Sequence, residues 1–528
     1  MNGADALIST LVSGGVEVCF ANPGTSEMHF VGALDAVPGL RGVLTLFEGV
    51  ATGAADGYAR IAEKPAAVLL HLGPGLGNGL ANLHNARRAG VPVVVIVGDH
   101  ATYHKKYDTP LESDIDAVAG TVSGWLRRSD RTVEVGLDAA AAIRAAIGPP
   151  SQVATLILPA NVSWSDGAQP AGMPDAAQTA AQTAEPTAEP TAEAVAATAL
   201  QSGRDAVLLI GGAATREPWL SAAARIRQAT GARLLCETFP TRWERGAGVP
   251  QVTRLPYLEK LAAEELKDAK HLILAGARAP VSFFAYPKKP GDLVPAECAV
   301  HQLEVSALHA LAELVAPDTI AEPESVTPRP KLPPGPLNGA KIAEAISELL
   351  PEHAIVVDES NTAGFTLLDA TAGAPRHDWL TLTGGAIGYG LPAATGAAIA
   401  VPNRRVLCLE ADGSAMYTIS ALWTHARENL NITTVIYNNR SYDILRLELL
   451  RVGRSGPPGP KAQELLQLKP PELDFVAIAT GMGVPARRAI TAEEFSECLS
   501  AALREPGPHL IDAVIEPTSP ETLAFLAS

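Results

Sequence analysis

Short apolar runs that end in polar or glycine-containing tips recur along this chain, with helix-length segments between them. The first part of the chain contains five such runs, GVEVCFANPG, GVLTLFEG, AAVLLHLGPG, VPVVVIVGD and VATLILPA. Strands that are apolar on both sides are typical of parallel sheets covered by helices on both faces. The pattern therefore predicts a parallel α/β sheet.

The same alternation occurs in two further parts of the chain. The runs there are DAVLLIGGAA, GARLLCETFP, HLILAGARAP and CAVHQLEV, followed by AIVVDES, DWLTLTG, RRVLCLEADG, TTVIYNN and HLIDAVIE. TAEPTAEPTAEA and AEPESVTPRPKLPPGPL separate the parts, and such sequences cannot bury a core. At 528 residues the length also favours about three domains. We expect three doubly wound parallel-sheet domains at 1–165, 196–320 and 338–528, with linkers at 166–195 and 321–337.

The first and last domains contain one similar stretch. From Val68 and from Val406, both sequences run through a strand, a glycine-containing turn, a helix with Leu and Arg, and a second strand with a polar tip. This similarity indicates an old duplication with different chemistry at the strand tips.

The net charge and the cysteine content argue against some classes of function. The formal charge is −16 and no dense basic stripe occurs, which argues against a nucleic-acid partner. The five cysteines are scattered without a CxxC pair, so we expect a reducing cytoplasm and no zinc site. The first twenty residues lack the features of a signal peptide or membrane anchor, and no membrane association is expected.

Polar residues follow two apolar runs in EADGSAMYTISALWTHARENLNITTVIYNN, residues 410–439. Ligands of open parallel sheets bind beyond the carboxyl ends of the strands. Mg²⁺ prefers oxygen ligands, which Asp412 and Asn439 can supply, and the helix after Asp412 favours a phosphate. Taken separately, ADG and NNRS are ordinary turn sequences. Their placement at two strand ends favours a magnesium and diphosphate site.

The same residues resemble the thiamine diphosphate (ThDP) signature, in which DG and NN are separated by a spacer of mid-twenties length. The resemblance is to the pyruvate oxidase and acetolactate synthase superfamily, which includes benzoylformate decarboxylase, and it covers nearly the whole chain. It implies that Asp412, Asn439 and the backbone carbonyl of Ser441 hold Mg²⁺. It also implies that the diphosphate contacts Asn361, Thr362, Gly413 and Ser414. Ala411 departs from the family pattern, which has glycine there.

Glu48 follows an apolar run and begins the stretch EGVATGAADGYAR. A carboxylate at the start of a helix is stabilised by the helix dipole, but a buried one needs a partner. By the resemblance, Glu48 keeps the aminopyrimidine ring of ThDP in its reactive form. The alternative is an ordinary acidic residue at a helix start.

The glycine-rich stretch TLTGGAIGYGLPAATGAAIA covers residues 381–400. Such a stretch by itself indicates close helix packing more often than a cofactor loop. The resemblance implies that the backbone of Gly385 meets the amino group of ThDP and that Ile387 holds the cofactor in its bent shape.

Candidate substrate residues lie in the first domain. NPGTSE and LHLGPGLGN resemble segments of benzoylformate decarboxylase and point to Thr25 and His71, although a histidine within VLLHL can equally be a core residue. His100, His104, Lys105 and Lys106 follow another run and could meet an anionic 2-oxo acid, but a solvated loop is the interpretation we favour.

The resemblance implies a ThDP- and Mg²⁺-dependent 2-oxo acid decarboxylase or carboligase, most similar to acetolactate synthase large subunits. A benzoylformate decarboxylase-like activity is the first alternative, and a catalytically inert binding or regulatory protein is the second. PVSFFAYPKKP lacks the histidine that benzoylformate decarboxylase has there, and no FAD-holding pattern is found, so no FAD is expected. Relatives build each site from two chains, which implies a homodimer and commonly a homotetramer.

Overall fold

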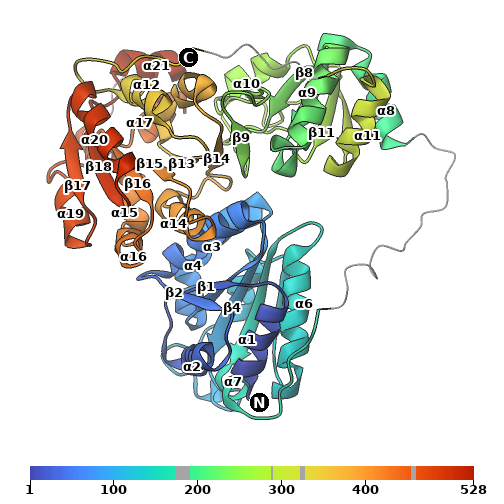
Figure 1. The fold of residues 1–528 in the computed structure, drawn as a ribbon, viewed down its shortest axis with the longest axis vertical. Coiled ribbons are helices and arrows are strands. Elements are labelled where there is room, and N and C mark those ends of the chain that lie inside the picture. Colours follow the sequence, from blue (N-terminus) through green and yellow to red (C-terminus); the bar gives the residue numbers. More distant parts are fainter. Residues whose placement is uncertain (174–190, 287–288, 321–327, 453–458, 528) are drawn as a thin grey trace.

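The computed structural model describes residues 1–173, 191–286, 289–320, 328–452 and 459–527. These residues form three α/β units, each built around its own sheet (Figure 1). The linkers predicted at 166–195 and 321–337 lie partly outside the described residues, and helix α8 (Ala192–Leu200) already begins within the first of them.

The first unit contains a six-stranded parallel sheet in the order β2-β1-β3-β4-β6-β5. Its central strands are buried along their whole length, as the apolar runs predicted. The strands are β1 (Val18–Ala21), β2 (Arg41–Leu44), β3 (Ala66–Leu70), β4 (Val93–Asp99), β5 (Trp125–Arg128) and β6 (Val153–Pro159). The helices are α1 (Gly3–Ser13), α2 (Met28–Ala36), α3 (Glu48–Ala62), α4 (Leu72–Ala89), α5 (Ile115–Gly120), α6 (Val135–Ile147) and α7 (Ala160–Trp164).

The middle unit has a five-stranded parallel sheet in the order β10-β8-β7-β11-β12. The strands are β7 (Ala206–Ile210), β8 (Arg233–Cys236), β10 (Thr253–Arg254), β11 (His271–Ala275) and β12 (Ala299–Leu303). Besides α8, its helices are α9 (Trp219–Thr230), α10 (Glu259–Leu266) and α11 (Leu308–Val315).

The last unit contains a seven-stranded sheet in the order β17-β18-β16-β15-β13-β14-β9. Six strands are parallel: β13 (Ile355–Glu359), β14 (His377–Thr381), β15 (Val406–Ala411), β16 (Ile432–Asn438), β17 (Ala486–Ala489) and β18 (His509–Val514). Strand β9 (Trp243–Arg245) comes from the middle stretch of the sequence and pairs antiparallel with β14. The helices are α12 (Gly339–Leu349), α13 (Leu367–Ala370), α14 (Gly390–Ala400), α15 (Asp412–Thr418), α16 (Ala421–Arg427), α17 (Asp443–Arg451), α18 (Pro460–Leu466), α19 (Phe475–Gly481), α20 (Ala492–Arg504) and α21 (Pro520–Ala527).

The first and last sheets share one strand order. Numbered within its own unit, each places its six parallel strands in the order 2-1-3-4-6-5, read from one edge. The similar stretches of the sequence become β3-α4-β4 in the first unit and β15-α15-α16-β16 in the last. The common topology supports the proposed duplication.

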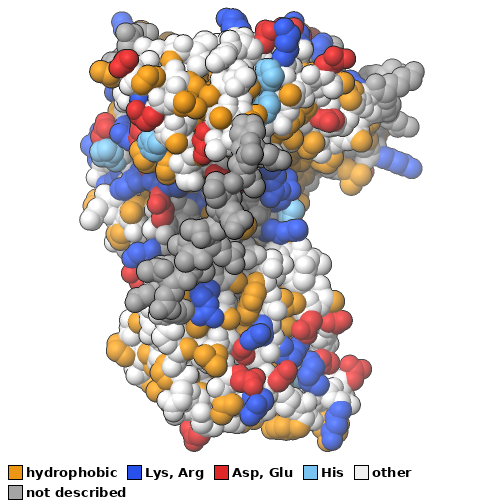
Figure 2. Space-filling view, turned by 90° about the vertical axis from the view of Figure 1, so that its right-hand side faces the viewer, with side chains coloured by type: hydrophobic (Ala, Val, Ile, Leu, Met, Phe, Trp, Pro, Cys, Tyr) orange, Lys and Arg blue, Asp and Glu red, His pale blue; other side chains and the backbone are white. Residues whose placement is uncertain are grey.

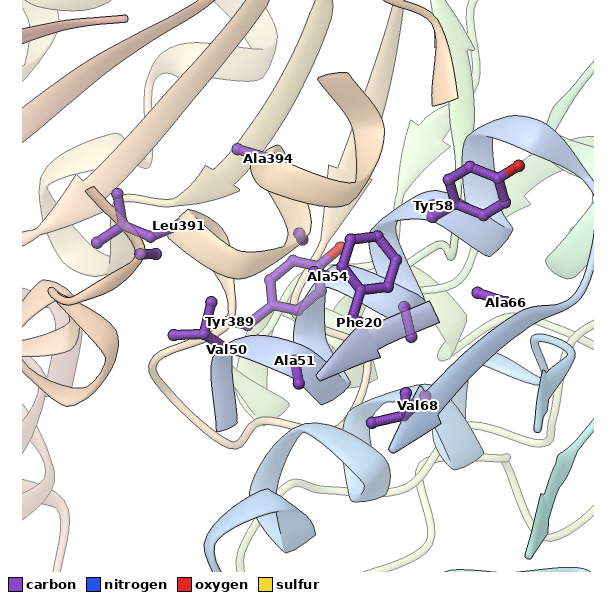
Figure 3. Packing of buried hydrophobic residues seen from close by; sticks show 14 of the residues in the cluster. Phe20, Val50, Ala51, Ala54, Tyr58, Ala66, Val68, Tyr389, Leu391 and Ala394 are labelled. Carbon is purple, nitrogen blue, oxygen red and sulfur yellow. The ribbon is translucent and has the colours of Figure 1, made fainter. Parts of the chain in front are cut away.

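Helices α3 and α14 pack closely across the boundary between the first and last units (Figure 3). A Cβ atom placed on Gly396 would lie 1.9 Å from the carbonyl oxygen of Ala54, and one on Gly57 would lie 2.1 Å from that of Ala393. Only glycine allows the two backbones to approach this closely. These glycines therefore serve helix packing, as the structural interpretation of the glycine-rich stretch allowed.

The parallel α/β fold class predicted from the sequence is confirmed, and each predicted run contains a strand. Strands β5, β9, β10 and β17 were not predicted because they are short and only partly buried or, in β9, lie outside the apolar pattern. Among the described residues, no helix is both long and apolar enough to cross a membrane. Figure 2 shows acidic, basic and apolar side chains interspersed on one face of the molecule.

Candidate functional site

Three neighbouring strands of the last sheet end at the predicted metal site. Strand β15 lies between β13 and β16, with Glu410 paired to Glu359 and Ala411 paired to Tyr437. Since the strands are parallel, the residues that follow them meet at one edge of the sheet. Asn361, Asp412 and Asn439 all follow these strand ends, as the sequence analysis required.

The Asp412 side chain is buried and is held by backbone N–H groups. Its carboxylate accepts hydrogen bonds from the N–H of Gly413, at 2.8 Å, and of Arg440, at 2.6 Å. Burial, with a smaller contribution from the nearby Asp443, raises the pKa of Asp412 to about 6, against the backbone N–H groups that lower it. A divalent cation at this position would offset the desolvation of the carboxylate.

Asn439 and Ser441 lie on the turn that follows β16. The Asn439 side-chain oxygen accepts a hydrogen bond from the Ser441 N–H at 3.0 Å, and its amide nitrogen donates to Asp443 at 3.2 Å. Both residues are buried, and Ser441 forms a backbone bridge with Gln467. The turn is thus fixed on both sides.

The predicted diphosphate contacts cluster next to this turn. The Asn361 amide donates to the Ser414 hydroxyl at 2.9 Å, which links the end of β13 to the start of α15. Gly413 is required by packing, because a Cβ there would lie 2.3 Å from the ring of Tyr442. Thr362 follows Asn361 in the same short 3₁₀ helix. Helix α15 has only seven residues, so its dipole is small. We therefore expect side chains to contribute more than the helix dipole to the predicted phosphate binding.

The loop with Gly385 and Ile387 is held by a buried carboxylate. Glu359 accepts hydrogen bonds from the backbone N–H groups of Gly388, Tyr389 and Gly390 at 2.8, 2.8 and 2.7 Å. Burial and the adjacent Glu359 raise the pKa of the Glu410 carboxyl well above its usual range. Burial also raises the pKa of Glu359 to about 7, against the three backbone N–H groups that it binds.

Gly385 has a left-handed backbone conformation, with φ at 75°. A Cβ atom there would lie 2.7 Å from the ring of Phe283, so glycine is needed for both reasons. Ile387 is partly buried and packs against the core that joins the first and last units.

Glu48 begins helix α3 and is 7% exposed. Its carboxylate accepts hydrogen bonds from the side-chain amides of Asn22, at 3.3 Å, and Asn78, at 3.0 Å. Among the described residues it forms no ion pair. This carboxylate is fixed by two neutral donors.

His71 precedes helix α4 and contacts a buried acid. Its Nδ1 lies 2.8 Å from Glu27 and 3.2 Å from the hydroxyl of Ser26. Glu27 itself is held by the N–H of Gly24 at 2.8 Å. This arrangement fixes the imidazole through Nδ1, and in the described part of the chain no hydrogen bond is made by Nε2. Thr25 is exposed beside it, so Ser26 is the hydroxyl that the structure joins to His71.

The charged loop after β4 is largely paired within itself. Lys105 lies 3.1 Å from Asp99 and 2.5 Å from Glu112. His100 bonds Thr109 at 3.1 Å, and His104 lies beside His100 and Tyr107. Lys106 lies over the ring of Tyr107. These contacts favour the interpretation as a solvated structural loop.

Sequence reasoning missed the residues that hold the proposed catalytic groups: Asn22, Ser26, Glu27, Asn78, Glu359 and Glu410. Asn22, Ser26 and Glu27 lie within the quoted NPGTSE, and Asn78 within LHLGPGLGN. These residues lie in segments at the ends of strands, and that position could have identified them as candidate site residues. The pairing itself depends on contacts between segments far apart in the sequence.

Comparisons with known proteins agree with this geometry. The thiamine pyrophosphate enzyme N-terminal TPP binding domain matches residues 1–119, and the corresponding C-terminal TPP binding domain matches residues 366–513. A Mycobacterium tuberculosis (strain H37Rv) protein, provisionally named acetolactate synthase large subunit IlvX, is 67% identical over 98% of this chain and 99% of its own length.

Two further relatives cover nearly the whole chain. Benzoylformate decarboxylase of Pseudomonas aeruginosa is 30% identical over 96% of this chain and 97% of its own length. The structure of a ThDP-dependent 4-hydroxybenzoylformate decarboxylase from Rhodococcus jostii RHA1 has a TM-score of 0.82 with 24% identity, and covers 98% of this chain and all of its own. The chain thus belongs to the thiamine pyrophosphate enzyme family and is a ThDP-dependent enzyme.

Proposed function

We propose that this enzyme requires Mg²⁺, decarboxylates a small 2-oxo acid and joins the resulting acyl unit to a carbonyl acceptor, as an acetolactate synthase does. The proposal rests on the positions of Asn361, Asp412 and Asn439. All three residues follow adjacent parallel strands and lie at the same edge of the sheet. The name of the 67% identical relative supports this choice of reaction.

The donor set fits a hard divalent cation. Asp412 supplies a carboxylate, Asn439 an amide oxygen and Ser441 a backbone carbonyl, which are the oxygen ligands that Mg²⁺ prefers. Among the described residues, no cluster of three or more His, Cys, Asp or Glu side chains forms an alternative metal site. A site with a single carboxylate leaves coordination positions for diphosphate oxygens and water.

When bound, ThDP supplies a carbon centre that accepts the electrons released by decarboxylation. Glu48 is fixed by Asn22 and Asn78 and would accept a hydrogen bond from a protonated ring nitrogen of the cofactor. Gly385 and Ile387 orient the cofactor rings, and the Glu359 carboxylate keeps their loop in place. These residues would hold the cofactor in its reactive geometry. Such preorganisation lowers the activation free energy by several kcal/mol, which corresponds to a rate increase on the order of a thousandfold.

His71 is the proposed acid or base toward the substrate. Its Nδ1 is bound by Glu27, so Nε2 donates or accepts a proton at the substrate oxygen or carbon. Thr25 lies on the same segment and is proposed as a hydroxyl contact to the substrate. The paired loop with His100, His104, Lys105 and Lys106 receives no catalytic role.

A non-oxidative decarboxylase like benzoylformate decarboxylase is the second candidate. The pair of Glu27 and His71 favours it, because a fixed imidazole can protonate the product carbon without an acceptor. The inert alternative is opposed by the intact arrangement of Glu48, Asp412 and Asn439.

We further propose that two chains form each site, in a homodimer that assembles into a homotetramer. The family resemblance supports this proposal, because relatives build each site from two chains. Sedimentation of the ThDP-loaded protein tests this, and a monomeric holoenzyme would contradict it.

The five cysteines are free in the structure. Free buried thiols are typical of a reducing compartment. We propose a cytoplasmic location on that basis.

One assay distinguishes the proposed reactions. The protein with ThDP and Mg²⁺ is incubated with pyruvate, with pyruvate plus 2-oxobutyrate, and with benzoylformate, and both CO₂ and carbon products are measured. Acetolactate or a mixed 2-hydroxy acid supports the ligase, whereas benzaldehyde supports the second candidate. If calorimetry confirms ThDP binding and none of the 2-oxo acids releases CO₂, both proposed reactions are contradicted.

A further inference from the structure

A cavity of about 630 Å³ lies at the boundary of the middle and last units, apart from the residues proposed for catalysis. Its walls include the aromatic residues Trp243, Tyr257 and Phe365 and several aliphatic side chains. Cavities of this size with apolar walls and a few polar groups commonly bind small organic molecules.

The charged side chains that line the cavity are mainly basic. They are Arg227, Arg245 and Arg254, against the single carboxylate of Asp369. The cavity therefore has a positive balance in a protein whose formal charge is −16.

Arg245 is the most constrained of these arginines. It is 8% exposed, donates hydrogen bonds to the Thr371 hydroxyl at 3.2 Å and the Leu368 carbonyl at 2.5 Å, and lies over the rings of Trp243 and Trp379. Among the described residues, no carboxylate forms an ion pair with Arg245. The guanidinium is therefore buried without a carboxylate to offset its desolvation, and an anion in the cavity would compensate for that cost.

Arg254 increases this positive charge. Burial and the like charge of Arg254 together lower the pKa of Arg245 to about 9, against the nearby Asp369, which raises it. In the described part of the chain, the Arg254 side chain makes no ion pair and no hydrogen bond. Two cations that repel each other would be stabilised by an anion between them.

The two arginines come from different sheets. Arg245 ends β9, which pairs with β14 in the last unit, whereas Arg254 ends β10, which pairs with β8 in the middle unit. A ligand bound to both would connect the two units.

We propose that this cavity is a binding site for an amphipathic organic anion, with a carboxylate or phosphate group on Arg245 and Arg254 and an apolar body against Trp243, Tyr257 and Phe365. None of the residues that line the cavity is among those proposed to hold ThDP or Mg²⁺, and the proposal does not depend on which reaction the enzyme performs.

The test uses the protein saturated with ThDP and Mg²⁺, so that the cofactor site is filled. 8-Anilinonaphthalene-1-sulfonate serves as the fluorescent probe, and phenyl phosphate, benzoate and the neutral benzyl alcohol are titrated as competitors. We expect both anions to displace the probe and benzyl alcohol not to. The more effective anion identifies the head group.

Arg254→Gln is the test variant and Arg278→Gln is the matched control, because Arg278 is an exposed arginine that lines a different cavity. Loss of one charge-assisted hydrogen bond predicts about tenfold or more weaker probe binding in Arg254→Gln. Binding to Arg278→Gln should stay within about twofold of the original protein. Equal affinity in both variants, a larger loss in Arg278→Gln, or no anion binding would overturn the proposal.

Thermal unfolding provides a second readout. A ligand that bridges β9 and β10 stabilises the folded state by mass action. Saturating phenyl phosphate should raise the melting temperature of the original protein and of Arg278→Gln but not that of Arg254→Gln. An equal rise in all three proteins would place the ligand elsewhere.

Discussion

The backbone N–H of Arg440 donates a 2.6 Å hydrogen bond to the carboxylate of Asp412, across 28 residues of sequence. Arg440 has a left-handed conformation, with φ at 59°, so the turn after β16 is bent toward the end of β15. The hydrogen bond places Asp412 beside the turn that contains Asn439. It also makes the geometry of the proposed metal site dependent on both strands.

Replacing Asp412 with Ala should remove Mg²⁺-dependent binding of ThDP. The variant lacks the only carboxylate of the proposed ligand set, and we expect affinity to fall by about a hundredfold or more. Calorimetric titration of ThDP with and without Mg²⁺ measures the change. Asp35→Asn, at an exposed position of α2, is the control. Unchanged affinity in Asp412→Ala would exclude Asp412 as a ligand.

Glu48→Gln should separate cofactor binding from catalysis. The amide keeps the size of the side chain but cannot hold the positive charge on the cofactor ring, so turnover should fall by about 10²–10⁴-fold. The ThDP dissociation constant should change by only a few-fold. Steady-state kinetics and calorimetry on the same samples measure both, and retained turnover would contradict the proposed role.

Ala411 departs from the glycine of the family pattern without strain. Its φ and ψ are −72° and 144°, an extended conformation that any residue adopts. Ala411→Gly should therefore leave ThDP affinity within about twofold and lower the free energy of unfolding by about 0.5–1 kcal/mol, because glycine loses more entropy on folding. Calorimetry and urea unfolding test the two parts. A large gain in ThDP affinity would show that alanine impairs the site.

Gly396→Ala should destabilise the contact between α3 and α14. The new Cβ would meet the Ala54 carbonyl at 1.9 Å, and we expect a loss of about 1–3 kcal/mol or more in the free energy of unfolding. Gly32→Ala in α2 is the matched control, since its Cβ would meet open space and helix propensity should stabilise it by up to about 1 kcal/mol. Similar urea midpoints for the two variants would rule out the packing argument.

His425 should make stability depend on pH. Burial lowers its pKa from an ordinary 6.5 to about 4. Between these values the unfolded chain binds more protons, so stability rises with pH, is complete above 6.5 and is lost as pH falls toward 4. This shift corresponds to about 3 kcal/mol.

His425→Gln should reduce this pH dependence. Glutamine can still donate to Thr395, which His425 contacts at 2.9 Å, but it does not titrate. Urea unfolding at pH 7.5 and 4.5 measures the slope in both proteins. Burial also lowers the pKa of His377 to about 4, but this residue is present in both proteins. If the free energy of unfolding changes equally with pH in both, His425 is not the cause of the pH dependence.

Much of the proposed metal site could be predicted from the sequence. Asp412 and Asn439 follow two successive apolar runs, and the ends of successive parallel strands meet at one edge whenever the strands are neighbours. Glu48 and the loop with Gly385 were predicted from the family resemblance. The apolar runs likewise predicted the fold class.

The partners of these residues could not be predicted. Glu359 binds the loop at Gly388, and Glu27 binds His71, through contacts between distant segments. Hydrophobic periodicity reports which face of an element is buried and carries no information about its partner. The same limit hid β9, whose three residues lie within the middle stretch of the sequence but join the last sheet.

By itself, the sequence determined the parallel α/β elements and the polar residues at their carboxyl ends, because local apolar patterns and turn residues specify these features. Only the tertiary structure decided that Asn22 and Asn78 hold Glu48, that Gly396 lies against Ala54, and that Arg245 and Arg254 face one cavity. Such contacts follow from the order in which strands and helices pack, and the free energy that selects this order is distributed over the whole core.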